Sequence, residues 1–366
     1  MTTKAGHEGH NESLRTQRTI EAISLKSQKN FTMEQGKKLG VALVGLGVYS
    51  EGELGPALKE TKHCYLAGIV SGSEKKKKKW KKEYDLPGSN IYSYEDFDSI
   101  KNNDSIDIVY VVLPNSMHKE YVIRAAKAGK HVICEKPMAN TVEECDEMIA
   151  ACKEAGVLFS IGYRLHFDPF NLEMMRLASE KKYGAVKRIS ASHGLSSAQG
   201  WRLDKELAGG GPLMDVGIYC VNAGRYITDL EPIAVHAAEG QKKDKKKFAA
   251  VEESLTWAME YSNGVIAECS CSYSQYGNHL RVEAENGWFE IVPSFSYSGL
   301  KGKTSEGKMD IRPINQQAAQ MDDFALAVID KRPTPVPGEM GRQDMKIIEA
   351  IYRSMETGQR VEVRET

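Results

Sequence analysis

The sequence has no long apolar run, no excess of charge of one sign and no paired-cysteine motif. None of its apolar stretches approaches the roughly 20 residues that span a bilayer, so no membrane partner is expected. Its 366 residues carry a net charge of −1, which argues against nucleic acid as a partner. Residues 1–36 are polar and lack the apolar segment of a secretory signal. A cytoplasmic location is therefore expected, or a periplasmic one if the N-terminus comes from a processed precursor.

Metal-ligand spacings are also missing. The seven cysteines are an odd number and show no CxxC or zinc-ligand spacing, which predicts reduced, buried thiols. Cys269 and Cys271 would lie on one face of a strand, where they would pack rather than bind metal. His7 and His10 fall in the polar terminal segment and are interpreted as bystanders. No metal cofactor is expected.

The first half of the chain alternates short apolar runs with helical patterns. A length of 366 residues exceeds a single core and predicts two domains. The alternation predicts a parallel sheet with right-handed crossovers. Strands are expected at 39–47, 65–70, 106–113, 131–134 and 157–162, and helices near 54–60, 75–84, 119–128 and 141–155.

The second half changes to alternating runs joined by turns, which predicts a mostly antiparallel sheet in an α+β domain. Strands are expected at 189–193, 234–239, 253–261, 265–273, 280–285 and 287–292, and helices at 316–330 and 341–355. We divide the chain into an arm (1–36), a first domain with a doubly wound parallel sheet (37–163) and a second domain with a large open-faced sheet (164–366). The two closing helices are free to pack back on the first domain. The open sheet face favours a homodimer or homotetramer.

The loop after the first strand has part of a dinucleotide-binding fingerprint, Gly45-Leu-Gly47. The first glycine permits a tight turn, and the second lets the backbone approach a pyrophosphate at a helix N-terminus. Ser50 stands at the third glycine position, so the motif is weak by itself. Combined with the strand–helix alternation, it predicts a Rossmann domain with a dinucleotide site.

The end of the second strand indicates which dinucleotide would bind. NAD sites usually place Asp or Glu there, but this strand ends in Ser71-Gly72, followed by Glu74 and a run of lysines. A hydroxyl with nearby positive charge suits the 2′-phosphate of NADP, so we expect NADP rather than NAD. The rest of the lysine-rich helix is interpreted as a solvated face, with a basic patch as the alternative.

The fourth strand ends in the triplet Glu135-Lys136-Pro137. Proline stops a central strand, and ligands of doubly wound folds bind at this carboxyl edge of the sheet. A lysine there can supply a proton or a positive charge to a reacting oxygen. Taken alone, the triplet would more often be a solvated ion pair that begins a loop.

Five segments, in order, resemble the Gfo/Idh/MocA family of oxidoreductases: Gly45-Leu-Gly47, Leu113-Pro-Asn-Ser-Met-His118, Ala128-Gly-Lys-His131, Glu135-Lys-Pro137 and Gly162-Tyr-Arg164. Within the family, three later stretches are most similar to the bacterial glucose–fructose oxidoreductase branch: residues 199–203, 206–211 and 213–219. The resemblance runs from residue 39 to about residue 361 and covers both domains. The arm and the lysine run fall outside it.

The resemblance implies an acid–base pair for sugar chemistry. Many family members carry Asp-x-x-x-His, whereas this sequence has Asp215-Val-Gly-Ile-Tyr219, as the glucose–fructose branch does. Tyr219 would accept the sugar proton during oxidation and return it during reduction. Because tyrosine is a weak base at neutral pH, Lys136 is the expected supporting cation. Asp215 would orient the sugar; a helix-capping aspartate with a core tyrosine is the alternative.

The resemblance also implies the contacts to the cofactor. Ser71 and Lys76 fall where the 2′-phosphate is bound, and Tyr94 falls beside the adenine. Trp201 and Arg202 fall at the nicotinamide end, although such a pair can be a surface cation–π contact; His118 alone would more often be structural. The expected set is Gly45, Gly47, Val48, Tyr49, Ser71, Lys76, Tyr94, Leu113, Asn115, His118, Glu135, Lys136, Arg164, Trp201 and Arg202.

The activity implied is NADP-dependent oxidation of an aldose to its lactone, with reduction of a second sugar such as fructose by the same bound cofactor. Two alternatives stay open: a sugar dehydrogenase that releases NAD(P) in each turnover, and a non-catalytic NADP-sensing regulator. In the similar enzymes an N-terminal arm wraps a neighbouring subunit, but the arm of this chain differs in sequence.

Overall fold

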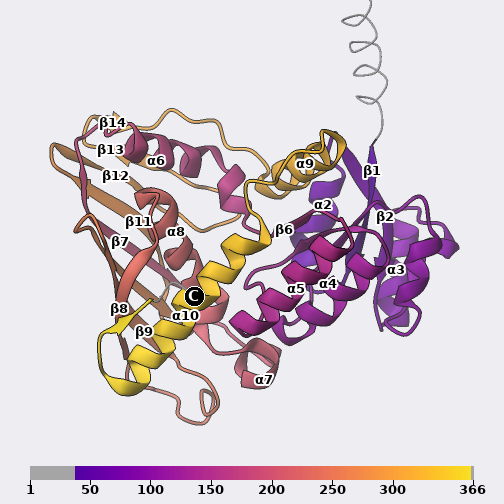
Figure 1. Ribbon diagram of the computed structural model, residues 1–366, viewed down its shortest axis with the longest axis horizontal. Coiled ribbons are helices and arrows are strands. Elements are labelled where there is room, and N and C mark those ends of the chain that lie inside the picture. Colours follow the sequence, from indigo (N-terminus) through magenta and orange to yellow (C-terminus); the bar gives the residue numbers. More distant parts are fainter. Residues whose placement is uncertain (1–37, 364–366) are drawn as a thin grey trace, which may run out of the picture.

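The protein, seen in a computed structural model, is described over residues 38–363, so the arm expected at 1–36 lies outside the described residues. Two sheets form the cores of two adjoining domains (Figure 1). The first sheet has six parallel strands, and the second has nine strands that are mostly antiparallel. The fold class predicted from the sequence is confirmed. Among the described residues, no helix is both long and apolar enough to cross a membrane.

The first sheet has the strand order β3-β2-β1-β4-β5-β6, which is that of a Rossmann fold. Its strands are β1 (Leu39–Val44), β2 (Cys64–Val70), β3 (Ile91–Tyr92), β4 (Ile108–Val111), β5 (His131–Cys134) and β6 (Phe159–Ile161). Every residue of β1 and β4 is buried. This burial on both faces explains why these strands are unbroken apolar runs in the sequence.

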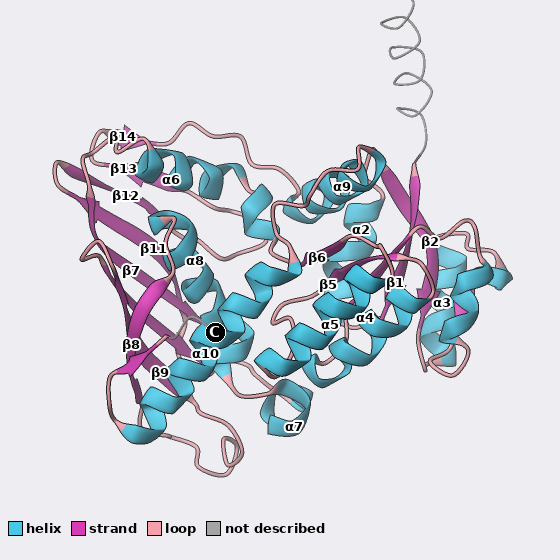
Figure 2. Ribbon diagram, viewed as in Figure 1, coloured by secondary structure: helices cyan, strands magenta, loops and turns pink. Residues whose placement is uncertain are grey.

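Helices cover both faces of the first sheet (Figure 2). One face carries α4 (His118–Lys127) and α5 (Val142–Glu154); the other carries α2 (Gly55–Leu58), α3 (Glu74–Glu83) and α9 (Gln316–Ile329). Helix α9 comes from the far end of the chain, and its Met321 and Phe324 share a core with Leu43 and Tyr110. Asp322 of α9 accepts hydrogen bonds from the backbone nitrogens of residues 62 and 63. The sheet is therefore completed by a segment distant in sequence.

The second sheet has the strand order β14-β13-β12-β11-β7-β10-β9-β8-β15, and only its β7–β10 pair is parallel. Its strands are β7 (Val186–Gly194), β8 (Pro232–Glu239), β9 (Ser254–Tyr261), β10 (Ile266–Ser272), β11 (Gly277–Ala284), β12 (Gly287–Ile291), β13 (Gly302–Thr304), β14 (Gly307–Lys308) and β15 (Val361–Glu362). Helices α6 (Pro169–Ser179), α8 (Ile218–Thr228) and α10 (Gly338–Thr357) lie on one face, and α7 (Lys205–Ala208) lies beside the first domain (Figure 1).

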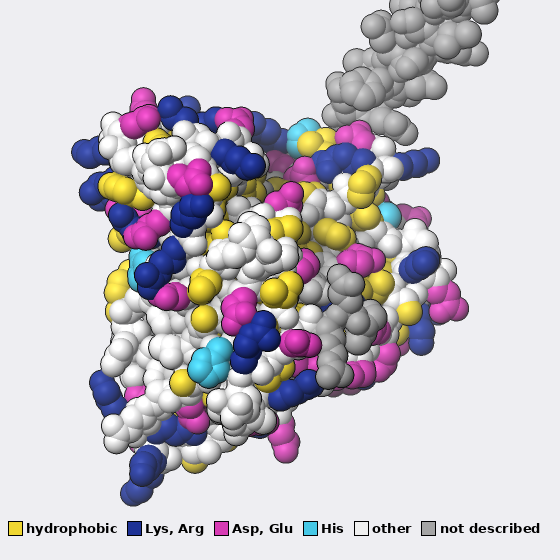
Figure 3. Space-filling view, turned by 60° about the vertical axis from the view of Figure 1, so that its left-hand side comes forward, with side chains coloured by type: hydrophobic (Ala, Val, Ile, Leu, Met, Phe, Trp, Pro, Cys, Tyr) yellow, Lys and Arg dark blue, Asp and Glu magenta, His cyan; other side chains and the backbone are white. Residues whose placement is uncertain are grey.

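The other face of the second sheet carries small and charged side chains. Neighbouring strands pair opposite charges across it, as between Arg188 and Glu268 and between Arg281 and Glu290. Figure 3, which brings the left-hand side of Figure 1 forward, shows basic and acidic groups mixed with isolated apolar side chains. This face is more polar than the face that α6, α8 and α10 cover.

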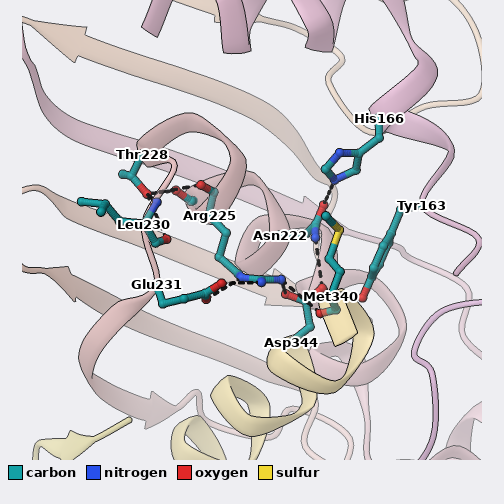
Figure 4. Close-up of polar contacts among 10 residues, drawn as sticks. Tyr163, His166, Asn222, Arg225, Thr228, Leu230, Glu231, Met340 and Asp344 are labelled. Carbon is teal, nitrogen blue, oxygen red and sulfur yellow. Dashed lines mark hydrogen bonds and ion pairs between the residues drawn. The ribbon is translucent and has the colours of Figure 1, made fainter. Parts of the chain in front are cut away.

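A buried polar network joins α8 to α10 and to the segment after β6 (Figure 4). Asp344 of α10 has no exposed surface and pairs with Arg225 at 2.6 Å. The same carboxylate accepts hydrogen bonds from the Asn222 amide at 3.0 Å and from the Tyr163 hydroxyl. The Oδ1 atom of Asn222 accepts from His166 Nε2 at 2.8 Å. The network therefore fixes α8 relative to the end of the first domain.

Some elements differ from the sequence-based expectation. The helix expected near 54–60 is a π-helical turn, Ser50–Leu54, that continues into the four residues of α2. Strands β13, β14 and β15 were not expected, because they are only two or three residues long and show no apolar alternation. The short strands lie at the edges of the second sheet, whereas the π-helical turn directly follows the glycine-containing loop after β1.

Candidate functional site

A cavity of about 500 Å³ lies between the carboxyl edge of the first sheet and the second domain. The first domain contributes the loops after β1, β2, β4 and β5, and the second contributes a 3₁₀ turn (Gly200–Leu203), a π-helical turn (Leu213–Gly217), the start of α8 and the loop after β12. The lining residues are Gly45, Leu46, Gly47, Val48, Tyr49, Ser71, Gly72, Ser73, Lys76, Tyr94, Val112, Leu113, Pro114, Asn115, Glu135, Lys136, Trp201, Arg202, Asp215, Tyr219 and Tyr297.

The two glycines of the loop after β1 have different reasons to be glycine. Gly45 has φ +96°, and a Cβ there would lie 2.3 Å from the Val112 carbonyl oxygen, so the fold itself requires glycine. Gly47 has no neighbour within 4 Å of an added Cβ. No described residue excludes a side chain at Gly47, so this glycine instead leaves room for a ligand to approach the protein backbone. This arrangement fits a dinucleotide pyrophosphate beside the loop.

The end of the cavity at β2 presents hydroxyl, ammonium and helix N-terminal groups. Ser73 caps α3 by accepting a hydrogen bond from the Lys76 nitrogen at 3.4 Å, and Ser71 lies just before it. The Lys76 ammonium donates to the Leu46 carbonyl at 2.5 Å, which holds it over the glycine loop. A Cβ added at Gly72 would lie 3.3 Å from the Tyr94 ring, so this ring covers the turn.

No carboxylate among the described lining residues follows β2. The two lining acids are Glu135, which follows β5, and Asp215, in the turn before α8. The hydroxyl of Ser71, the ammonium of Lys76 and the N-terminus of α3 are the groups present at the β2 end. These groups fit the 2′-phosphate of NADP.

Lys136, Asp215 and Tyr219 meet at the opposite end of the cavity. The Lys136 ammonium donates to the Asp215 carbonyl at 2.6 Å, lies 3.8 Å from the Asp215 carboxylate and stands 4.7 Å from the centre of the Tyr219 ring. Asp215 belongs to the π-helical turn, and Tyr219 to the first turn of the helix that continues from it. The cation, the carboxylate and the phenol expected from the sequence to form an acid–base site therefore lie within one cluster.

Asp215 is held as a charged group. Its Oδ2 accepts hydrogen bonds from Arg202 Nε at 2.8 Å and from the Tyr273 hydroxyl at 3.2 Å. Burial raises the pKa of Asp215, but Lys136, Arg202 and these hydrogen bonds outweigh it, and the pKa lies below its ordinary value. The carboxylate therefore remains available to accept hydrogen bonds from a ligand hydroxyl.

Two buried groups hold the Glu135-Lys136-Pro137 segment in place. Glu135 Oε1 accepts from the Tyr110 hydroxyl at 2.7 Å, and a Cβ at Gly162 would come within 2.6 Å of this carboxylate. His118 is fully buried, and its ring nitrogens face the carbonyls of Leu113 at 2.9 Å and Pro137 at 3.0 Å. These contacts position Lys136 at the cavity wall.

Most of the residues expected from the sequence line this cavity. His118 and Arg164 do not: His118 binds the loop backbone, and Arg164 is buried beneath Tyr219. Asn115 lines the cavity and also donates to the Ala208 carbonyl at 2.7 Å, which ties the loop after β4 to α7. Sequence reasoning missed Tyr297, because it lies in an irregular, serine-rich loop that matches no motif.

Comparisons with known proteins identify the family of the chain. Residues 39–163 match the family model of the Gfo/Idh/MocA oxidoreductases, described as an NAD-binding Rossmann fold, and residues 171–291 match the family's C-terminal domain. The crystal structure of aldose-aldose oxidoreductase from Caulobacter crescentus, complexed with glycerol, is 42% identical, covers 89% of this chain and 100% of that chain, and superposes with a TM-score of 0.87.

Two further relatives extend the comparison. D-xylose 1-dehydrogenase [NADP(+)] of Haloarcula marismortui is 28% identical over 86% of this chain and 91% of its own length. A levoglucosan dehydrogenase in complex with NADH and levoglucosan is 20% identical, with a TM-score of 0.76 over 90% of this chain and 100% of that chain, and shares the fold. The chain therefore belongs to the Gfo/Idh/MocA family of oxidoreductases, and its first domain is the family's nicotinamide-dinucleotide-binding Rossmann domain.

Proposed function

We propose that the protein is an NADP-dependent sugar oxidoreductase that oxidises an aldose at C1 to its aldonolactone and uses the same bound cofactor to reduce a second sugar, such as fructose. The observation that carries this proposal is the meeting of Lys136, Asp215 and Tyr219 at one end of a cavity whose other end suits NADP. The names of two relatives, an aldose-aldose oxidoreductase and a D-xylose 1-dehydrogenase, support a sugar as substrate.

The residues have separate roles in this proposal. The bound nicotinamide supplies the hydride chemistry. Tyr219 takes the proton of the sugar hydroxyl during oxidation and returns it to the carbonyl oxygen during reduction. Lys136 places positive charge beside the reacting oxygen. Asp215, whose Oδ2 is already bonded to Arg202 and Tyr273, uses its remaining oxygen to orient the sugar.

The preference for NADP rests on the β2 end of the cavity. Ser71 and Lys76 line it, and none of the described lining residues after β2 is acidic. An aspartate or glutamate at this position would repel a 2′-phosphate. The xylose dehydrogenase relative is named for NADP(+), whereas the levoglucosan dehydrogenase structure contains NADH, so membership of the family alone does not decide the cofactor.

A panel of aldoses and ketoses, assayed with NADP and with NAD, tests the activity directly. Oxidation of at least one aldose with NADP is the expected result. Absence of turnover with every aldose would contradict the proposal. Adding an aldose to purified protein without free cofactor then tests whether the protein retains bound NADP. If one bound NADP serves both sugars, the absorbance of reduced nicotinamide should rise with the aldose and fall again when a ketose is added. An ordinary dehydrogenase would need added cofactor in every cycle.

Tyr219→Phe and Lys136→Met distinguish a catalyst from an NADP-sensing regulator. Loss of an acid–base group costs about 10²- to 10⁴-fold in rate, so both variants should lose kcat while still binding NADP. Lys127→Met, which removes an exposed lysine at the end of α4, is the matched control and should keep full activity. If the catalytic variants turned over as fast as wild type, the assigned roles would be wrong.

We also propose that the chain forms a homodimer or homotetramer through the outer face of the second sheet. Helices α6, α8 and α10 pack on the opposite face, and the outer face presents paired charges between small side chains and the exposed Ile266. In a symmetric dimer, the same surface of each subunit commonly packs against its copy on the other subunit. Light scattering on the purified chain should give two or four times its mass, and Glu268→Lys should reduce it; a monomer would contradict this proposal.

A further inference from the structure

Arg164 is a buried cation that contacts the hydroxyl of Tyr219 directly. It begins the 3₁₀ turn after β6 (Arg164–Phe167), and only 1% of its surface is exposed. Its guanidinium carbon lies 5.3 Å from the centre of the Tyr219 ring and 4.6 Å from that of Tyr297. Its Nη2 atom also donates to the Tyr219 hydroxyl at 3.4 Å. The guanidinium therefore reaches the oxygen that would carry the negative charge of an ionised tyrosine.

The guanidinium of Arg164 has neutral hydrogen-bond acceptors. Nη2 donates to the Phe295 carbonyl at 2.6 Å, and Nη1 donates to the Ser296 carbonyl at 3.1 Å and to the side-chain oxygen of Gln316. None of these acceptors is a carboxylate, and Nε has no hydrogen-bond partner. Burial raises the pKa of Glu135 and of Glu53, and the charge of Arg164 acts against this rise in both, but among the described residues no carboxylate is in direct contact with the guanidinium. A buried cation without a carboxylate in contact is costly, so this charge is most favourable when an adjoining group is negative.

Gln316 separates Arg164 from an acid. The Gln316 amide nitrogen donates to Asp168 Oδ2 at 3.0 Å, while its oxygen accepts from Arg164. Asp168 in turn caps α6 through the Asn171 nitrogen at 3.0 Å. A carboxylate is therefore present nearby, but an amide is interposed and the charge of Arg164 is not neutralised by direct contact.

Lys136 is less available to the Tyr219 hydroxyl than Arg164 is. The Lys136 ammonium stands over the ring face rather than at the hydroxyl, and it is bonded to the Asp215 carbonyl with the Asp215 carboxylate 3.8 Å away. Its charge is therefore shared with an acid. The charged and titratable groups that face Tyr219 are Lys136, Arg164, Asp215, His193 and the hydroxyls of Tyr49 and Tyr297.

The other groups around Tyr219 do not replace Arg164. His193 packs edge-on, 5.3 Å between ring centres, and burial together with Lys136 and Arg164 lowers its pKa to about 3, so it is neutral at pH 7. Burial also lowers the pKa of Arg164, but the neighbouring tyrosine hydroxyls, Tyr219 foremost, outweigh it and hold that pKa above the ordinary value. Arg164 therefore stays charged.

We propose that Arg164 is a positioning residue that stabilises the ionised hydroxyl of Tyr219, and that Gln316 keeps the charge of Arg164 available for this purpose. The inference rests on the proposed role of Tyr219 as the group that exchanges a proton with the sugar. In the oxidation direction the ionised Tyr219 oxygen accepts the hydroxyl proton of the substrate and becomes a neutral phenol that Arg164 still orients. This role differs from the cofactor contact that the sequence analysis predicted for Arg164.

The central test is Gln316→Glu, a change of nearly equal volume that places a carboxylate against the guanidinium. Neutralising the charge of Arg164 removes the cation that stabilises the ionised hydroxyl, so tyrosinate at position 219 should form at a pH about one to three units higher than in wild type. The ultraviolet absorbance of tyrosinate, taken as the difference between each protein and the same protein carrying Tyr219→Phe, reports this titration without substrate. The pH profile of kcat should move by the same amount, about tenfold in rate per unit at neutral pH.

Two comparisons make the test specific. Asn315→Asp adds the same charge one residue earlier, at the α9 N-cap, where aspartate caps equally well and does not touch Arg164. It gives up only the exposed hydrogen bond from the Asn315 amide to Glu60, and it should leave the titration unchanged. Arg164→Met should raise the pH at which tyrosinate forms at position 219, as Gln316→Glu does, and Arg164→Lys should restore part of the difference.

The outcomes separate the inference from the proposed function. An unchanged Tyr219 titration in folded Gln316→Glu, or equal changes in Gln316→Glu and Asn315→Asp, would overturn the role of Arg164. If Arg164→Met did not fold, Gln316→Glu would still decide. If wild type oxidised no sugar, the proposed function would fail, but the tyrosinate titration would still show whether Arg164 sets the ionisation of Tyr219.

Discussion

Lys76→Met should cost the protein affinity for NADP but not for NAD. The Lys76 ammonium is held 2.5 Å from the Leu46 carbonyl, on the wall of the cavity and beside the N-terminus of α3. A hydrogen bond to a charged group contributes about 1.5–3 kcal/mol. Since each 1.4 kcal/mol is about tenfold in affinity, the Kd for NADP should rise about 10- to 150-fold. NAD lacks the 2′-phosphate, so its Kd should change by less than about threefold.

The matched control is Lys78→Met, on the same helix. Lys78 is exposed and does not line the cavity, so its removal changes the net charge equally without removing a contact. Calorimetric titration of nucleotide-free protein with NADP and NAD, at two salt concentrations, measures both affinities. Equal losses for NADP and NAD in Lys76→Met, or the same loss of NADP affinity in Lys78→Met, would refute the assignment of this end of the cavity to a 2′-phosphate.

Three further predictions concern stability. Gly45→Ala should lower the melting temperature, because the backbone there has a positive φ and the added Cβ would clash with the Val112 carbonyl. Gly47→Ala should leave the melting temperature unchanged and weaken dinucleotide binding. Equal melting temperatures of the two variants would contradict this. Asp344→Asn should cost about 1–3 kcal/mol in urea unfolding, because the buried Arg225 loses one of its two carboxylate partners and keeps Glu231, and an unchanged midpoint would count against that. Burial lowers the pKa of His166 to about 4. The neutral His166 therefore contributes up to about 3 kcal/mol to the free energy of unfolding at pH values above its unfolded-state pKa of about 6.5. This contribution is lost as the pH falls from about 6.5 to 4. His166→Gln should flatten this pH dependence, and parallel curves would exclude His166 as its source.

The sequence was most informative where burial imposes a simple pattern. The strands β1, β4 and β5 are buried runs, so their ends could be located, and with them the turn at Gly45 and the triplet at Glu135-Lys136-Pro137. The order of motifs along the chain then placed Asp215 and Tyr219. All of these residues except Pro137 line the cavity.

The remaining features depend on contacts between segments distant in sequence. Tyr297 lines the cavity from a loop with no periodic pattern, and Gln316 reaches Arg164 across 152 positions of the chain. Their side chains match no local motif, so no reading of the sequence could place them beside Tyr219. Arg164 itself was found through the Gly162-Tyr-Arg164 segment, but its position under the Tyr219 hydroxyl, outside the cavity lining, follows only from the three-dimensional packing.

The packing of α9 on the first sheet has a consequence for dissecting the molecule. Ala318, Met321, Phe324 and Ala325 cover the face that β1, β2 and β4 would otherwise expose. A fragment that ends at residue 163 would therefore leave an apolar surface in water and should aggregate. An independently stable nucleotide-binding fragment would have to be made by joining α9 to residues 38–163 through a new linker, because the unit that folds is not continuous in the gene.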